Sequence, residues 1–236
     1  MGPSATGVAP ARARGPTCIG TMRPMRKTPA RCPNVTVIAL GGNAGPTRAA
    51  DLRRLDAALA RLSRVLGRGL RASRPWVSPA WPPGLGGPDF VNAVATIPAR
   101  RPPEAVLARL HAVEAAMGRV RRARWGVRPV DLDLVAQGAA VRPDAATQRA
   151  WRRLDPARQR REAPGRLILP HPRIEDRAFV LLPLAARAPG WRHPLTGRTV
   201  AAMARALPLA ARRGLRPLAP PRPARPASLV KRPRRA

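Results

Sequence analysis

The order in which two kinds of apolar segment follow one another is the feature that most limits how this chain can fold. Short runs rich in β-branched residues are typical of strands, and longer stretches with apolar residues three and four positions apart are typical of amphipathic helices. The predicted strands span residues 35–40, 70–77, 90–97 and 131–136, and the predicted helices span residues 51–66 and 102–117. Strands and helices therefore alternate as βαββαβ.

That order is the signature of a ferredoxin-like α+β sandwich, here followed by a C-terminal elaboration. The chain has 236 residues, enough for one ordinary domain with a sizeable core. We expect a folded catalytic domain over residues 35–207, between a disordered extension over 1–34 and a disordered, Pro- and Arg-rich tail over 208–236. Residues 142–165 look like an insertion with a short helix, and the sequence does not indicate its role.

The charge of the chain is extreme, at +33. Arginine makes up nearly all of the 45 basic residues, since Lys27 and Lys231 are the two lysines. Because arginine is spread along the whole chain, the charge does not by itself indicate a nucleic-acid partner, and no specific one is expected. Weak nonspecific binding by residues 212–235 is an alternative, and such binding should collapse when salt is added.

Cysteine usage and hydropathy indicate the compartment. Cys18 and Cys32 both fall in the N-terminal extension, and two cysteines at this spacing make no metal site. No apolar run approaches the ~20 residues of a membrane span, so no membrane partner is expected. We therefore expect a cytoplasmic protein.

Residues 119–133 are the stretch most informative about chemistry. Five arginines surround one tryptophan, and Asp131 and Asp133 follow at the start of a predicted strand. In a strand, residues two apart point to the same face, where two carboxylates repel unless a hard cation such as Mg²⁺ lies between them. Guanidinium groups bind phosphate bidentately. The pattern indicates nucleotide-dependent phosphoryl chemistry, and the alternative is a basic loop before a salt-bridged strand.

Several separated blocks add a resemblance to a known family. They are Ala39-Leu-Gly-Gly-Asn43, Ser78-Pro79, Phe90-Val-Asn92, Glu114-x-x-x-Gly118-Arg-Val-Arg121, Arg124-Trp-Gly-x-Arg128-x-x-Asp131-Leu-Asp133, Leu169-Pro-His-Pro172 and Arg177-x-Phe179. In this order and spacing the chain resembles the 6-hydroxymethyl-7,8-dihydropterin pyrophosphokinases of folate biosynthesis over roughly residues 35–207. The resemblance implies transfer of pyrophosphate from ATP to the hydroxymethyl group of a reduced pterin, with release of AMP.

The resemblance also implies a role for individual residues. Two Mg²⁺ ions would be held by Asp131 and Asp133. The residues expected to be catalytic are Arg119, Arg121, Arg128, Asp131 and Asp133. Those expected to bind ATP are Glu114, Arg121, Arg124, Arg128, Arg166, His171 and Arg177. Those expected to bind the pterin are Ser78, Pro79, Phe90, Asn92, Trp125 and Phe179. The chain has only two phenylalanines, and both stand at these pterin positions.

The chain departs from the family in places, and its sequence allows two other interpretations. Gly42 and Val127 stand where the family commonly has serine and proline, and neither change removes a metal ligand. A carboxylate-bridged metal protein built on His111-x-x-Glu114 would need a second such motif, and the sequence has none. An inactive relative is disfavoured because the aspartate pair is retained. The oligomeric state, monomer or homodimer, is left open.

Overall fold

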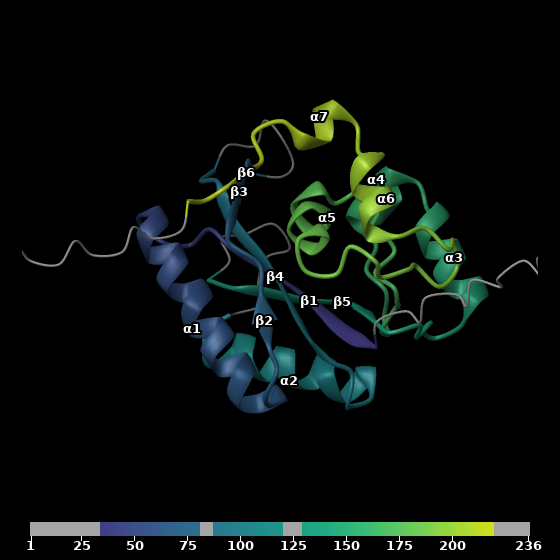
Figure 1. The fold of residues 1–236 in the computed structure, drawn as a ribbon, viewed down its shortest axis with the longest axis horizontal. Coiled ribbons are helices and arrows are strands. Elements are labelled where there is room, and N and C mark those ends of the chain that lie inside the picture. Colours follow the sequence, from purple (N-terminus) through teal and green to yellow (C-terminus); the bar gives the residue numbers. More distant parts are fainter. Residues whose placement is uncertain (1–33, 81–86, 120–128, 220–236) are drawn as a thin grey trace, which may run out of the picture. The chain divides into compact units, whose positions relative to one another are not determined.

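The computed structural model describes residues 34–80, 87–119 and 129–219. Its strands are β1 (Val35–Gly42), β2 (Arg71–Ala72), β3 (Trp76–Ser78), β4 (Phe90–Pro98), β5 (Asp131–Gln137) and β6 (Arg216–Pro217). Its helices are α1 (Arg48–Leu66), α2 (Pro103–Ala116), α3 (Ala145–Arg153), α4 (Pro156–Arg161), α5 (Ala178–Ala185), α6 (Val200–Arg205) and α7 (Leu209–Arg212). The strands form one antiparallel sheet in the order β5-β1-β4-β3-β6, with β2 paired to β4 (Figure 1).

Helices α1 and α2 cover one face of the sheet (Figure 1). The side chain of Thr47 caps α1 by accepting a hydrogen bond from the Ala50 amide, and Gly67 ends the helix with a φ of 100° that other residues rarely adopt. Prolines open α2, where the missing amide hydrogen costs nothing. Apolar residues of both helices pack against alternate residues of β1, β4 and β5, which forms the first core.

Helices α5 and α6 cover the opposite face and enclose a second core (Figure 1). Val37, Ala39 and Val94 contribute to this core from the sheet, and Leu181 contributes from α5. The fully buried Trp191 belongs to the same core, and its indole nitrogen donates to the Gly138 carbonyl over 2.8 Å. The sheet therefore separates two apolar cores, and the residues of β1 alternate between them.

The mixed helix and strand content and the antiparallel sheet confirm the expected class. Each predicted strand and helix is present, although the predicted strand over 70–77 is two short strands, β2 and β3. Residues 142–165, expected to be an insertion, contain α3 and α4. In the described part of the chain, no helix combines the length and the apolar character that crossing a membrane takes.

The structure corrects the expected start of the disordered tail at residue 208. Residues 209–217 form α7 and β6, and the Leu218 amide donates to the Pro75 carbonyl over 2.8 Å. Gly214 has a φ of 74°, and a Cβ on it would lie 2.6 Å from Cγ of Pro79, so this segment packs closely on the loop after β3. The physical reason is that leucines in this segment pack against the two cores. Residues 1–33 and 220–236, also expected to be disordered, lie outside the described residues.

Candidate active site

A row of residues crosses the sheet where β1 ends and β4 and β5 begin. Asp131 of β5 faces Gly41 of β1, Gly41 faces Asn92 of β4, and Asn92 faces Trp76 of β3. Residues directly opposite one another on neighbouring strands share a face of the sheet. Gly41 lies two residues beyond Ala39, which belongs to the core under α5 and α6. The row therefore lies on the α5 side of the sheet.

The two aspartates lie on this same face, as the i, i+2 spacing predicted. Asp133 pairs with Ala39 in the ladder, one step along from Asp131. Each carboxylate contacts an arginine: Nη1 of Arg119 lies 2.5 Å from Oδ1 of Asp131, and Nη1 of Arg177 donates to Oδ2 of Asp133 over 2.9 Å. The side chains of Asp131 and Asp133 are 23% and 40% exposed, so both carboxylates remain open to a ligand.

Glu114 is buried between α2 and β5. Its Oε1 accepts a hydrogen bond from the Leu132 amide over 2.8 Å and also contacts Nη1 of Arg119. Strand β5 lies at an edge of the sheet, so the carboxylate satisfies a backbone amide at that edge. Burial alone would lower the pKa of Arg119, but the carboxylates of Asp131 and Glu114 outweigh it and raise that pKa above its ordinary value. Arg119 therefore stays charged between Glu114 and Asp131.

Arg177 and Phe179 are placed by the start of α5. Arg177 is the N-cap residue of this helix, and its guanidinium carbon lies 5.8 Å from the centre of the Phe179 ring. Phe179 is partly buried. The same guanidinium thus touches the Asp133 carboxylate and lies over an aromatic ring, which links the predicted metal ligand to a predicted pterin residue.

Asn92, Ser78 and Phe90 come together on β3 and β4. Nδ2 of Asn92 donates to Oγ of Ser78 over 2.9 Å, and both side chains are buried. Ser78 also faces Phe90 in the β3–β4 ladder. Pro79, the next residue, is exposed. The hydrogen bond to Ser78 therefore holds the amide of Asn92 in one orientation within the row that starts with Asp131.

His171 lies in the turn after the Leu169–Pro170 segment. Its amide donates to the Val135 carbonyl over 2.8 Å, and its Nδ1 accepts from the Arg173 amide over 3.1 Å. Burial, then the guanidiniums of Arg177 and Arg173, holds its pKa well below the ordinary value, against a smaller opposing effect of Asp131. The ring is therefore neutral at pH 7, and because Nδ1 accepts, Nε2 carries the proton.

The remaining predicted residues are not brought into these contacts. Arg166 is exposed. It contributes to the low pKa of Asp144, which is due first to hydrogen bonds from Thr147. Four predicted residues lie outside the described part of the chain: Arg121, Arg124, Trp125 and Arg128.

Two members of the row, Gly41 and Trp76, were not among the predicted site residues. A Cβ on Gly41 would lie 3.0 Å from Oδ1 of Asn92, so a side chain at this position would require the asparagine to shift. Trp76 faces Asn92, and its indole nitrogen is buried without a hydrogen-bond partner. The signal for Gly41 was available, because it belongs to the block Ala39–Asn43, whereas nothing in the sequence marks Trp76.

The donor set fits a cation that takes most of its ligands from elsewhere. Among the described residues, no three His, Cys, Asp or Glu side chains gather closely enough to hold a metal ion by themselves. Mg²⁺ is usually held by one or two carboxylates together with water and substrate phosphate oxygens. Asp131 and Asp133 suit that mode, and Glu114 is already engaged by Arg119 and the Leu132 amide. His111 is exposed, so it does not join Glu114 in a buried metal site.

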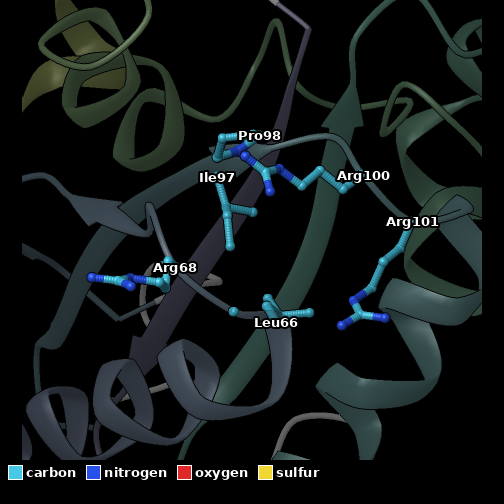
Figure 2. A pocket seen from close by; sticks show the side chains of 7 residues that line it. Leu66, Arg68, Ile97, Pro98, Arg100 and Arg101 are labelled. Atoms are coloured by element: carbon cyan, nitrogen blue, oxygen red, sulfur yellow. The ribbon is translucent and has the colours of Figure 1, made fainter.

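A separate pocket of about 310 Å³ lies at the other end of β4. Figure 2 shows Arg68, Arg100 and Arg101 around it, with Leu66 and Ile97 among its lining residues. None of the predicted site residues lines this pocket. Because Asn92 lies near the start of β4 and Ile97 near its end, the pocket is distinct from the row that carries the aspartates.

Comparison with known proteins identifies a family and relatives of this chain. The model of a family described as 7,8-dihydro-6-hydroxymethylpterin-pyrophosphokinase (HPPK) matches residues 37–189. A 2-amino-4-hydroxy-6-hydroxymethyldihydropteridine pyrophosphokinase of Synechocystis sp. is 35% identical over 182 residues, covering 76% of this chain and 80% of its own length. A protein of the same name from Pseudomonas aeruginosa is 35% identical over 158 residues, covering 66% and 82%.

A solved structure is similar in fold. It is a Plasmodium falciparum HPPK-DHPS chain with pterin and p-hydroxybenzoate, and it matches with a TM-score of 0.50 at 13% identity. The match covers 73% of this chain and 43% of that chain, so the present chain spans less than half of the Plasmodium polypeptide.

Proposed function

Because the chain belongs to the 7,8-dihydro-6-hydroxymethylpterin-pyrophosphokinase family, we propose that the row through Asp131, Gly41 and Asn92 marks its active site. The chain transfers pyrophosphate from ATP to the hydroxymethyl group of 6-hydroxymethyl-7,8-dihydropterin in folate synthesis, and AMP is the other product. One observation carries the placement of the site. Two carboxylates on one face of β5, each touched by an arginine, share that face with a buried asparagine on β4.

The metal requirement is part of the proposal. We infer that two Mg²⁺ ions are held by Asp131 and Asp133, with water and ATP oxygens completing their coordination. Bound Mg²⁺ would supply charge that neutralises the triphosphate and polarises the phosphoryl group. Arg119 and Arg177 orient the two carboxylates, and Glu114 fixes Arg119 from its buried side.

Phosphate binding falls to charged and neutral donors around these carboxylates. Arg119 and Arg177 supply fixed positive charge, and neutral His171 supplies an Nε2–H that can donate to a phosphate oxygen. Phosphoryl transfer asks the protein mainly for positioning and charge stabilisation, which such a set provides. Arg166 and the arginines of residues 120–128 (Arg121, Arg124 and Arg128) are proposed to bind ATP as well.

The pterin is proposed to bind beside Asn92. A flat ring with polar edges needs aromatic faces and a few fixed hydrogen-bonding groups. Phe90 lies two residues before Asn92 on β4, and Ser78 holds the amide of Asn92. Phe179 lies beneath the Arg177 guanidinium that contacts Asp133. Pro79 and Trp125 complete the proposed pterin residues.

The ferredoxin-like topology of the sheet and helices is also part of the proposal. The order β5-β1-β4-β3 with antiparallel neighbours, and α1 and α2 on one face, supports a ferredoxin-like arrangement. A cytoplasmic location and a monomeric or homodimeric state stay predictions from the sequence.

The test is the release of AMP from ATP and Mg²⁺ with and without 6-hydroxymethyl-7,8-dihydropterin. We expect AMP that depends on the pterin, together with the pterin diphosphate. ADP in place of AMP would mean transfer of a single phosphoryl group. Replacing Mg²⁺ with a chelator should abolish turnover, and turnover that survives chelation would contradict the proposed metal requirement.

A further inference from the structure

The segment that carries His171 is held by backbone contacts on two sides. Leu169 pairs with Arg142 through two hydrogen bonds, of 2.9 Å and 3.1 Å, and the His171 amide donates to Val135 of β5. Leu169 is fully buried in the core beneath α1 and α2. These backbone hydrogen bonds hold the segment at Leu169 and at His171. A side chain contacts the residue between them.

That side chain is Gln148 of α3. Its Nε2 donates to the Pro170 carbonyl over 3.1 Å, immediately before His171. Gln148 is the one buried residue of α3, and its relative exposure is 0%. The hydrogen bond from this buried side chain therefore joins α3 to the segment that carries His171.

The energetics of Gln148 point to the same contact. Its Oε1 is buried without a hydrogen-bond partner, so half of the amide is desolvated with nothing gained. Methionine would fill nearly the same volume without that cost. What glutamine offers in return is the donor to Pro170, which fixes a direction as well as a distance.

Helix α3 also contacts the far side of the turn. Arg152 lies one helical turn after Gln148, and its Nη2 is 2.9 Å from Oε2 of Glu175. Between Glu175 and His171, the Ile174 amide donates to the His171 carbonyl over 3.0 Å. The helix thus contacts the turn before and after His171, and it belongs to the 142–165 insertion, to which the sequence assigned no role.

We propose that Gln148 is a positioning residue for the reaction: its hydrogen bond to Pro170 lets α3 hold the His171 turn at the nucleotide. This rests on the proposed function, which places His171 among the residues that bind ATP. An imidazole can donate to a phosphate oxygen only within a narrow range of distance and direction. Loosening the turn should weaken ATP binding and leave the pterin side unaffected.

The experiment compares Gln148→Met with Arg149→Met, a control at the next residue of α3, which is exposed. We expect Gln148→Met to raise the KM for ATP about threefold to tenfold with kcat and the KM for the pterin unchanged, and Arg149→Met to match the wild type. Gln148→His keeps an N–H donor of similar reach, so its KM for ATP should stay near the wild-type value. A purely structural role would lower the thermal midpoint and the amount of active enzyme without separating the two KM values.

A second readout does not depend on activity. The chain has three histidines, so imidazole NMR signals can be assigned, and those of His171 should shift in Gln148→Met but not in Arg149→Met. If the methionine variant does not fold, Arg152→Met loosens the same helix from Glu175 and should raise the KM for ATP in the same direction.

Two results would overturn the proposal and are distinguishable. A KM for ATP within twofold of wild type in Gln148→Met, where His171→Ala raises it, would show that Gln148 does not position the turn. A KM for ATP unchanged in His171→Ala itself would show that His171 is not at the nucleotide, and the proposed role of Gln148 would fail with that part of the proposed site.

Discussion

Gly41 and Asn92 face each other across β1 and β4, and a Cβ on Gly41 would lie 3.0 Å from Oδ1 of Asn92. Nδ2 of the same asparagine is held by Oγ of Ser78 at 2.9 Å. The amide nitrogen is therefore held by the Ser78 hydroxyl, and the amide oxygen lies close to Gly41, which has no side chain. A Cβ at position 41 would require that oxygen to shift by a few tenths of an ångström.

We expect Gly41→Ala to raise the KM for the pterin about threefold to tenfold, because the methyl group pushes the amide of Asn92 away from Ser78. The KM for ATP should not change. Gly165→Ala is the matched control, since a Cβ at that position would meet nothing within 4 Å. Steady-state kinetics with each substrate varied in turn is the measurement. Equal KM values for the pterin in both variants would show that Asn92 is not confined by Gly41.

Asp133→Asn should abolish most activity while leaving the fold intact. We expect turnover to fall by at least about 100-fold, because a carboxylate proposed to hold Mg²⁺ is lost. The pair between Asp133 and Arg177 is 40% and 30% exposed, so its loss should change the free energy of unfolding by less than about 1 kcal/mol. Turnover is measured together with urea unfolding.

Asp176→Asn is the control for that substitution. Asp176 is 68% exposed, and its carboxylate lies 3.9 Å from Nε of Arg173. We expect wild-type turnover and stability from this variant. If Asp133→Asn retained wild-type turnover, the proposed metal site would be wrong.

The parts of this molecule that the sequence predicted are those set by short-range periodicity. The β-branched run at 35–40 and the leucines of 51–66 predicted β1 and α1. In both cases the apolar pattern that indicates the element lies within one continuous segment. The shared face of Asp131 and Asp133 follows from the two-residue period of a strand. Each of these inferences needs only one segment.

The contacts that the sequence could not predict join segments far apart in the chain. Glu114 reaches the Leu132 amide, and Gln148 reaches the Pro170 carbonyl 22 residues away. No local pattern specifies which backbone group a buried polar side chain will meet. The expectation that the tail is disordered from residue 208 was wrong for a related reason. It relied on a composition rich in proline and arginine, whereas a few leucines in the segment pack against the two cores.

The C-terminal segment gives a third prediction. Leu215 packs against the core under α5 and α6, and Leu218 packs against the other core. Removing residues 208–236 should lower stability by about 2–4 kcal/mol, from the apolar area that these side chains lose. Removing residues 220–236 should leave it unchanged. Thermal unfolding of both truncated chains is the measurement, and equal midpoints would contradict the packing of residues 208–219.

Stability should also depend on pH through His193. This residue is fully buried, its Nδ1 accepts from the Leu195 amide over 3.2 Å, and its Nε2 has no hydrogen-bond partner. Burial lowers the pKa of His193 from 6.5 to about 4, with Glu175 opposing this shift and Arg152 adding to it. Between those two values the unfolded chain binds a proton that the folded chain does not.

The sign of the effect follows from that difference in proton binding. Stability should be constant above pH 6.5 and fall as the pH drops from 6.5 towards 4, with a loss from His193 of about 2 kcal/mol by pH 5. His193→Asn keeps an oxygen that can accept from Leu195 and removes the titration. We expect this variant to lose less stability than the wild type between pH 7.5 and pH 5, measured by urea unfolding. Equal losses in both proteins would show that burial of His193 does not set the acid sensitivity.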